Sequence, residues 1–397
     1  MNRPDYYEFH APTRLLSGRD ALANLGGEFT RLGASRPLVV SDSVIAGLGL
    51  LDRVAKALRG TGVAPAGVFD AVPADPPSDV VDAIAARYDE IGADSFLAVG
   101  GGSVLDSAKG AAMIAASRQD GATGLADVRG FDIIRRRLPP MVAVPTTAGT
   151  GSEATLVAVI SDPQRDVKME FISPHLIYDA AVLDPVMTRS LPPKGTAATG
   201  MDALTHAVEA FSGRQANPVS RSYAATAIRL VSAHIRRAVA DGGDQEARMA
   251  LADASFLAGA AFSNSMVGAV HALGHSVGAL CHVPHGVAMA VLLPHVMRFN
   301  LPSVEADYAE LLLPLAGPEV YAGTPESDRA RAAIASIEAL QADLETAAGL
   351  PRRLRDCGID EPDYGRIASK ALNDGAVITN PKPLGLEDAR RILKESW

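Results

Sequence analysis

Short apolar runs alternate with helix-like stretches through the first half of the chain, and this order constrains the fold more than any other feature. The runs are β-branched or bounded by Gly, Pro and Asp, as strands are: Pro37–Ser41, Ala66–Phe69, Ser95–Val99, Met141–Val144, Thr155–Ile160 and Ala181–Leu183. The first four are separated by stretches with helical periodicity at Val44–Leu58, Ser78–Ile91 and Val104–Ser117. This βαβα order is typical of a parallel sheet with helices on its faces.

The sequence predicts that the second half of the chain is helical. From about Pro192 onward, strand-like runs give way to long Ala- and Leu-rich stretches: Ala197–Phe211, Pro218–Val239, Gln245–Ala261 and Ala332–Ala348. Turn signals such as Ala316–Pro325 separate these stretches. A chain of 397 residues is long enough for two or three domains. We expect two: an α/β domain over residues 1–190 and an all-helical domain over residues 191–397.

Charge and cysteine content narrow the class of protein. Lys and Arg number 37 against 46 Asp and Glu, a net charge of −9, which argues against nucleic acid as the main partner. Two cysteines, Cys281 and Cys357, make no disulfide framework, as expected in a reducing compartment. The first ten residues lack the apolar core of a signal peptide. We therefore expect a cytoplasmic protein.

A segment without charged residues follows Asp253. The 44 residues between Asp253 and Arg298 contain no Asp, Glu, Lys or Arg, yet they hold five of the nine histidines. A membrane-spanning helix needs about 20 consecutive apolar residues. Asn264 and the five histidines interrupt this segment with polar side chains, and Pro284 interrupts it as a helix breaker. We therefore expect buried helices of a soluble domain and no membrane association.

The glycine run after the strand Ser95–Val99 is a candidate phosphate-binding loop. Gly100, Gly101 and Gly102 let the backbone approach a diphosphate closely, and the helix that follows offers free N–H groups. Ser103 is the expected N-cap of that helix, with Asp106 as its capping-box partner. A tight strand–helix turn without a ligand would produce the same pattern.

Asp42 closes the run Pro37–Ser41 and is a second candidate cofactor residue. An acidic residue after a strand accepts hydrogen bonds from an adenosine ribose and repels a 2′-phosphate, which points to NAD rather than NADP. The alternative is that Asp42 caps the next helix.

A hydroxyl-rich loop follows the strand Met141–Val144. Thr146, Thr147, Thr150 and Ser152 lie there among glycines and supply hydroxyl and backbone donors suited to a diphosphate or a carboxamide. Ligands of parallel sheets bind at the carboxyl ends of the strands, which favours binding over a simple polar turn.

Histidines and one carboxylate have the spacing of metal ligands. Asp202 and His206 lie four residues apart on one predicted helix, as do His271 and His275, and each pair therefore shares a helix face. His285 follows after Pro284. One carboxylate with several imidazoles suits Fe²⁺, Zn²⁺ or Mn²⁺. A lone buried histidine is usually a satisfied core residue, but two such pairs in one apolar domain favour a metal site.

Together these motifs resemble the iron-containing (group III) alcohol dehydrogenase family along nearly the whole chain. The similar segments are Gly100–Lys109, Pro145–Glu153, Gly200–Phe211, Val270–Gly286 and Asn380–Leu393. The resemblance implies a Rossmann-like N-terminal domain and an all-α C-terminal domain, an architecture shared with dehydroquinate synthase. It also implies a homodimer or a larger homo-oligomer.

The resemblance assigns roles by motif position. The metal ligands fall on Asp202, His206, His271 and His285, and a non-ligand catalytic histidine near the nicotinamide and the substrate falls on His275. Lys168 resembles a lysine that the family places near the cofactor ribose. The other cofactor positions are Asp42, Gly101, Gly102, Ser103, Thr146, Thr147 and Thr150, to which Asp106 and Ser152 of the same motifs are added.

The function so implied is an NAD- and metal-dependent alcohol dehydrogenase or aldehyde reductase acting on a small alcohol or diol. Fe²⁺ is the metal that the family name implies, with Zn²⁺ or Mn²⁺ as alternatives. Glycerol dehydrogenase-like and maleylacetate reductase-like enzymes share the architecture. A dehydroquinate synthase-like lyase would need a pocket rich in Lys and Arg, which the uncharged segment does not offer. A non-enzymatic protein that binds NAD and metal would be excluded by NADH production from simple alcohols.

Overall fold

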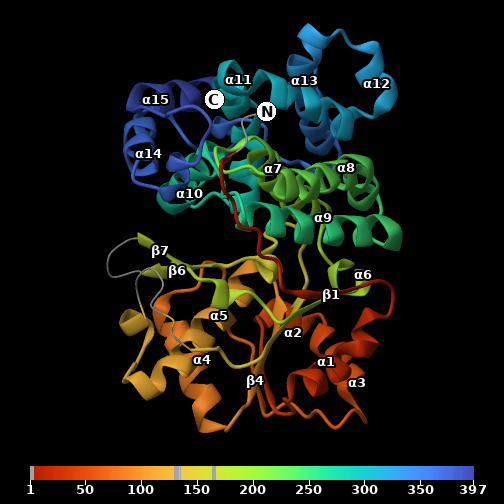
Figure 1. The fold of residues 1–397 in the computed structure, drawn as a ribbon, viewed down its shortest axis with the longest axis vertical. Coiled ribbons are helices and arrows are strands. Elements are labelled where there is room, and N and C mark those ends of the chain that lie inside the picture. The colour runs from red at the N-terminus through yellow and green to blue at the C-terminus, as the bar shows by residue number, and fades with distance from the viewer. Residues whose placement is uncertain (1–3, 129–133, 135, 163–166) are drawn as a thin grey trace. The chain divides into compact units, whose positions relative to one another are not determined.

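The computed structural model describes residues 4–128, 134, 136–162 and 167–397 (Figure 1). The chain divides into two compact units, one spanning His10–Ser190 and the other combining Met1–Phe9 with Leu191–Trp397. The first unit is built on a sheet and the second on helices, which confirms the predicted fold class.

A six-stranded parallel sheet forms the centre of the first unit. Its strand order is β1 (Arg14–Ser17), β8 (Ala180–Leu183), β5 (Met141–Pro145), β4 (Ser95–Gly100), β2 (Pro37–Val40) and β3 (Gly67–Phe69). Side chains alternate between its faces: Leu38 and Val40 belong to one buried cluster, and Val39 belongs to the other. A strand that is buried on both faces needs a continuous apolar run, which is the pattern that predicts β2, β4 and β5.

Helices cover both faces of this sheet. The cluster that contains Leu38 also holds residues of α4 (Ser78–Glu90) and α5 (Gly102–Ser117). The cluster that contains Val39 holds residues of α1 (Leu25–Leu32) and α3 (Leu50–Leu58). The predicted helical stretch Val44–Leu58 is two helices, because Gly49 has a φ of 70° and separates α2 (Ser43–Gly47) from α3.

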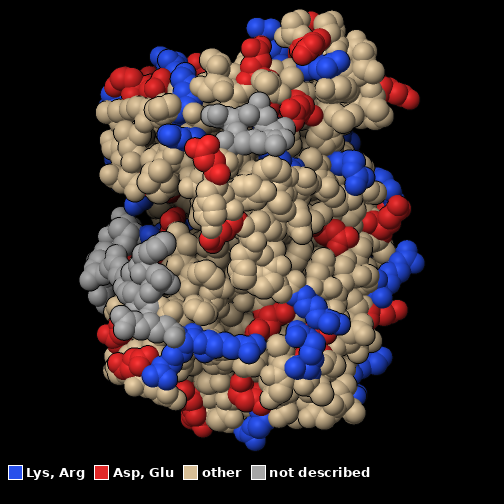
Figure 2. Space-filling view, in the orientation of Figure 1, with Lys and Arg blue, Asp and Glu red and all other residues tan. Residues whose placement is uncertain are grey.

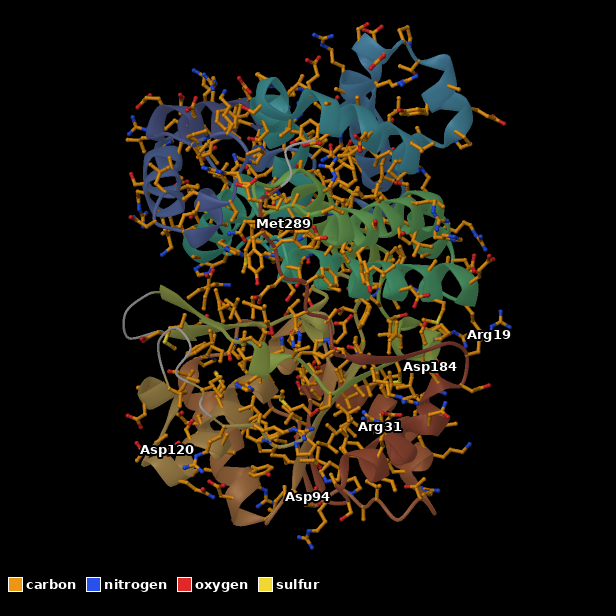
Figure 3. All side chains as sticks on the ribbon, viewed as in Figure 1. Arg19, Arg31, Asp94, Asp120, Asp184 and Met289 are labelled. Atoms are coloured by element: carbon orange, nitrogen blue, oxygen red, sulfur yellow. The ribbon has the colours of Figure 1, made fainter. Side chains whose placement is uncertain are left out.

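The first unit contains two further features besides the parallel sheet and its covering helices. The run Thr155–Ile160 contributes to β6 (Val157–Asp162), which pairs antiparallel with β7 (Val167–Ile172) in a separate hairpin. The short helix α6 (Pro185–Thr188) follows β8 and is capped by Asp184, which is labelled in Figure 3. The same carboxylate accepts a hydrogen bond from the Leu22 N–H at 3.3 Å.

The second unit is helical throughout residues 191–397. Its long helices are α7 (Pro193–Ser212), α8 (Pro218–Ala240), α9 (Gln245–Ser263), α10 (Ala269–Cys281), α11 (His285–Ala316) and α13 (Glu326–Ala348). Near the C-terminus lie α14 (Tyr364–Ala371) and α15 (Leu386–Glu395). The segment Ala316–Pro325, predicted as a turn, contains the short helix α12 (Pro318–Gly323), because Pro318 occupies the first helical turn, where proline is tolerated.

Helix α11 begins within the uncharged segment and continues past its end at Arg298. By length and composition it would suffice to cross a membrane, but 67% of its most apolar window is buried within the protein, as in the core helix of a globular fold. On the face shown in Figure 2, Lys and Arg lie interspersed with Asp and Glu.

Candidate metal and cofactor sites

Four potential metal ligands converge within the helical unit. Asp202 and His206 lie one turn apart on α7, His271 lies in the first turn of α10, and His285 begins α11. Each offers one ligand atom, and these atoms all lie within 4.8 Å of one another. The Asp202 Oδ1 lies 3.2 Å from the His285 Nε2 and 3.9 Å from the His206 Nδ1. The spacing in the sequence thus corresponds to a real cluster of donor atoms.

The electrostatics of this cluster suit a cation. Burial lowers the pKa of His206 to about 3, and burial together with the neighbouring His285 and His275 lowers the pKa of His271. Burial acts to raise the pKa of Asp202, but its histidine neighbours outweigh burial and hold that pKa below its usual range. His206 and His271 are therefore neutral imidazoles beside an ionised Asp202, the protonation states that a divalent metal requires of its ligands.

Two ring nitrogens in this cluster have no hydrogen-bond partner within the described part of the chain. The His206 Nδ1 and the His271 Nε2 are buried without a hydrogen-bond partner among the described residues. Leaving a buried polar atom unpaired is costly unless a ligand, water or ion satisfies it. Unpaired nitrogens beside an ionised carboxylate are therefore an arrangement that a bound divalent cation would satisfy.

Close packing of α11 against α7 brings His285 to Asp202. A Cβ on Gly286 would lie 2.4 Å from the carbonyl oxygen of Ala198, so only glycine permits this approach. Helix α10 also packs on α11: a Cβ on Gly274 would lie 2.1 Å from the Cε at the flexible end of Met289, which is labelled in Figure 3. Gly286, in one of the predicted metal motifs, thus permits the short distance between the two helices that carry Asp202 and His285.

Sequence reasoning missed two carboxylates that hold these histidines. The Glu209 Oε2 lies 2.5 Å from the His271 Nδ1, and the Asp374 Oδ2 lies 2.8 Å from the His275 Nδ1. Burial raises the pKa of Glu209 to about 7, while backbone N–H groups act in the opposite direction. Glu209 follows Asp202 by seven residues on α7, a helical spacing that would have indicated it. Asp374 lies 99 residues beyond His275, and no local pattern indicates it.

The glycine-rich loop lies at the carboxyl end of β4, as predicted, but its capping differs. Gly101, not Ser103, is the N-cap of α5, and no side chain caps it. Ser103 lies in the first helical turn, where its hydroxyl accepts a hydrogen bond from the Asp75 N–H at 3.3 Å. The predicted capping box of Ser103 with Asp106 is therefore wrong. Helix α5 begins two residues earlier than predicted, which places the hydroxyl of Ser103 past the cap position.

Asp106 instead connects α5 to the hydroxyl-rich loop and to β6. Its Oδ1 accepts a hydrogen bond from the Ser152 hydroxyl at 2.6 Å, and its Oδ2 accepts one from the Val159 N–H at 3.0 Å. One turn later, the Lys109 ammonium donates to the carbonyl oxygens of Thr155 and Val157 at 2.9 and 2.7 Å. Burial lowers the pKa of Lys109 to about 8. This face of α5 is therefore occupied by protein contacts.

The two predicted cofactor loops lie against each other. The Thr146 N–H donates to the carbonyl oxygen of Gly100 at 3.0 Å. A Cβ on Gly102 would lie 2.8 Å from the Thr150 Cγ2, and a Cβ on Gly101 would lie 3.4 Å from the Thr147 side chain. Strands β4 and β5 are neighbours in the sheet, so both loops leave its carboxyl edge side by side. The glycines thus permit a close approach between the two loops.

Asp42 and Lys168 have protein partners of their own. The Asp42 Oδ1 accepts a hydrogen bond from the Ile45 N–H at 2.9 Å, so Asp42 is the N-cap of α2. The Lys168 ammonium on β7 lies 3.0 Å from the Asp75 Oδ1. Asp75 in turn contacts Ser103, which connects the predicted ribose-side lysine to the glycine-rich loop.

Comparison with known proteins shows which family and which relatives this chain is similar to. The family model described as iron-containing alcohol dehydrogenase matches residues 12–185, and its C-terminal counterpart matches residues 196–397. The chain is 38% identical over 396 residues to 1,3-propanediol dehydrogenase of Klebsiella pneumoniae, covering 98% of this chain and 99% of that protein. It is 34% identical over 383 residues to lactaldehyde reductase of Escherichia coli (strain K12), covering 96% and 97% of the two chains.

Solved structures extend the likeness to three dimensions. A 1,3-propanediol oxidoreductase superposes with a TM-score of 0.93 at 36% identity, covering 99% of this chain and 100% of that chain. An alcohol dehydrogenase from Oenococcus oeni gives a TM-score of 0.92 at 32% identity with the same coverage. Because both halves of the sequence match and the relatives align over nearly their full length, the chain belongs to the iron-containing alcohol dehydrogenase family.

Proposed function

We propose that this protein is an NAD- and divalent-metal-dependent alcohol dehydrogenase, or aldehyde reductase, that transfers hydride between a small alcohol or diol and the nicotinamide. The observation that carries the proposal is the convergence of one carboxylate and three imidazoles, at Asp202, His206, His271 and His285, three of which are buried among the helices. The names of the relatives, 1,3-propanediol dehydrogenase and lactaldehyde reductase, support short diols and hydroxyaldehydes as the substrate class.

These four residues would hold the metal, and the cofactor residues would hold NAD. When bound, a divalent cation lowers the pKa of an alcohol by stabilising its alkoxide, and NAD supplies the hydride acceptor. The protein contributes the alignment of the reactants and low-charge surroundings that strengthen electrostatic interactions. Fe²⁺ is our first choice of metal, with Zn²⁺ and Mn²⁺ as alternatives, because this donor set accepts all three.

His275 is the proposed proton carrier. Its Nδ1 is held by the Asp374 carboxylate at 2.8 Å, which fixes the ring and makes Nε2 the atom that takes or releases a proton. Its side chain is 22% exposed, whereas that of His271 is 3% exposed. This partial exposure favours proton exchange with solvent over a purely structural role.

The two loops at the carboxyl edge of the sheet are the proposed dinucleotide site. Backbone N–H groups around Gly101 and Gly102 suit a diphosphate, and the α5 N-terminus adds its dipole. Asp42 favours NAD because its carboxylate would repel a 2′-phosphate. Asp106 and Ser152 act by holding the loops together, since they are bonded to each other. The proposed contacts with the cofactor are Asp42, Gly101, Gly102, Ser103, Thr146, Thr147, Thr150 and Lys168.

A single variant tests the metal site. His271→Ala is expected to abolish metal binding, measured by chelator competition, and turnover, measured by NADH absorbance. It should leave NAD affinity unchanged, since the proposed dinucleotide site lies in the other unit of the chain. Retention of full activity by the metal-free variant would overturn the proposal. The apoprotein reloaded separately with Fe²⁺, Zn²⁺ and Mn²⁺, and assayed against a panel of short alcohols and diols, identifies the metal and the substrate.

A further inference from the structure

Helix α10 starts without a capping side chain of its own, although its first turn carries His271. Its N-cap is Gly268, which has no side chain to accept hydrogen bonds from the free N–H groups. Two side chains from distant parts of the sequence accept them instead. The Ala269 N–H donates to the Asn380 Oδ1 at 3.1 Å, and the Val270 N–H donates to the Glu209 Oε1 at 2.8 Å.

The backbone at Gly268 is enclosed by these two acceptors. A Cβ at this position would lie 2.9 Å from the Asn380 Oδ1 and 3.0 Å from the Glu209 Oε1. Any other residue would push at least one of them away from the helix. Gly268 therefore has two effects: it provides no capping side chain for α10, and its lack of a Cβ leaves space for the Asn380 and Glu209 side chains to cap the helix.

Asn380 is itself held firmly. Its amide pairs reciprocally with the amide of Asn300 on α11, at 2.8 and 3.0 Å, and it also donates to the carbonyl oxygen of Lys382 at 2.7 Å. Asn380 is 1% exposed, Asn300 is 3% exposed and Glu209 is 6% exposed. Buried hydrogen bonds of this kind are costly to break, because the partner that remains is cut off from water.

Glu209 also contacts His271, and only a carboxylate can accept hydrogen bonds both from the α10 backbone and from this histidine. Its Oε1 caps Val270, and its Oε2 faces the His271 Nδ1 at 2.5 Å. A proton on Nδ1 leaves Nε2 as the lone-pair nitrogen, and Nε2 is the ring atom of His271 that has no hydrogen-bond partner among the residues that the structure describes. A carboxylate accepts from both the Val270 N–H and the His271 Nδ1–H, whereas an amide offers one acceptor oxygen and one donor nitrogen.

We propose that Glu209 and Asn380 are positioning residues that together hold the first turn of α10, so that His271 presents its Nε2 to the metal. This inference rests on the proposed metal site and adds a requirement for the C-terminal segment around Asn380, which contributes none of the proposed ligands. Its observable consequence is a change in metal affinity and coordination, separate from any change in stability.

Co²⁺ is a suitable probe, because its affinity and its visible absorption both report on the ligands. Apoprotein is titrated with Co²⁺ against a competing chelator for the wild type, Glu209→Gln, Asn380→Ala and the control Arg248→Met. Arg248 is buried in the same unit and bonded to Thr196, Leu191 and Gly242, none of them on α10. The control therefore removes buried hydrogen bonds without touching the helix that carries His271.

Co²⁺ affinity should fall about 10–100-fold in Glu209→Gln and about 3–10-fold in Asn380→Ala, with altered visible spectra, while Arg248→Met binds as the wild type does. The positioning role would be overturned if both test variants bound Co²⁺ as tightly as the wild type does. It would also be overturned if the control lost as much Co²⁺ affinity as the test variants. If the wild type itself fails to bind Co²⁺, the metal site as well as this inference is wrong. Glu209→Gln preserves side-chain size, so the question stays answerable even if Asn380→Ala does not fold.

Discussion

The Nδ1 of His275 lies 2.8 Å from the Oδ2 of Asp374, which follows it by 99 residues. The second oxygen of the same carboxylate accepts a hydrogen bond from the Ala376 N–H at 2.8 Å. Burial acts to raise the pKa of Asp374, but hydrogen bonds from His275 and Ala376 outweigh it and hold the pKa below its usual value. An ionised Asp374 therefore fixes both the tilt and the tautomer of the proposed proton carrier.

Asp374→Asn is expected to lower kcat by about 10–100-fold, because the amide would donate to Nδ1 and leave the proton on the wrong nitrogen. Metal affinity should stay close to that of the wild type, because His275 is not among the four proposed ligands. The measurement is kcat across pH together with chelator competition. An unchanged kcat and pH profile, or a loss of activity that tracks a loss of metal, would contradict the role of His275.

Asp42 combines two roles that one substitution separates. Asp42→Asn keeps the cap of α2, because asparagine is as good an N-cap as aspartate, and it removes only the charge. The ratio of kcat/KM for NAD to that for NADP should then fall about tenfold, since the repulsion of a 2′-phosphate is lost. Asp52→Asn on α3, another acidic residue of the same unit, is the matched control and should leave the ratio unchanged. No change of the ratio in Asp42→Asn would remove Asp42 from the cofactor site.

The sequence was informative where structure is local or continuous. Strands β2, β4 and β5 are buried on both faces, so they appear as unbroken apolar runs. Strand β1, with only four residues and mostly exposed side chains at the edge of the sheet, has neither the length nor the alternation to stand out. The i, i+4 spacing indicated Asp202 with His206 because a helix turns that spacing into proximity.

Contacts between residues far apart in the sequence could not be predicted, because no local pattern indicates them. The partners of His271 and of the α10 N-terminus come from α7 and from the segment near residue 380, up to 111 residues away. Nothing in the residues around His271 specifies which helix packs against them. Capping of α5 was mispredicted for a related reason: serine followed by aspartate three residues later fits a capping box, but Asp106 bonds instead to Ser152 on another segment.

Gly286 is expected to control metal affinity without being a ligand. In Gly286→Ala the new Cβ would meet the carbonyl oxygen of Ala198 at 2.4 Å, so the first turn of α11 must shift away from α7 and take His285 with it. Overpacking of this kind costs about 1–3 kcal/mol of stability. The variant should show a lower Tm as apoprotein and weaker metal binding by chelator competition.

Gly323→Ala is the matched control for this prediction. Gly323 ends α12 in the same unit, and a Cβ there would have nothing within 4 Å. It should therefore change neither Tm nor metal affinity appreciably. If Gly286→Ala binds metal as tightly as Gly323→Ala does, the close approach of α11 to α7 does not position His285.

His295 on α11 makes stability depend on pH independently of the proposed metal ligands. Burial, together with the nearby Arg298, lowers its pKa from 6.5 to about 4. Between these two values the unfolded chain takes up a proton that the folded protein refuses, so stability falls as the pH drops from about 6.5 to about 4. At 1.36 kcal/mol for each unit of pKa shift, the contribution is about 3 kcal/mol. His295→Gln removes this dependence. The free energy of unfolding of each apoprotein is measured by urea denaturation, and the value for the variant is subtracted from that for the wild type. This difference should be larger at pH 7.5 than at pH 4.5. The other histidines titrate in both proteins and cancel, so a difference that stays constant over this range would show that His295 is protonated as readily in the folded protein as in the unfolded chain.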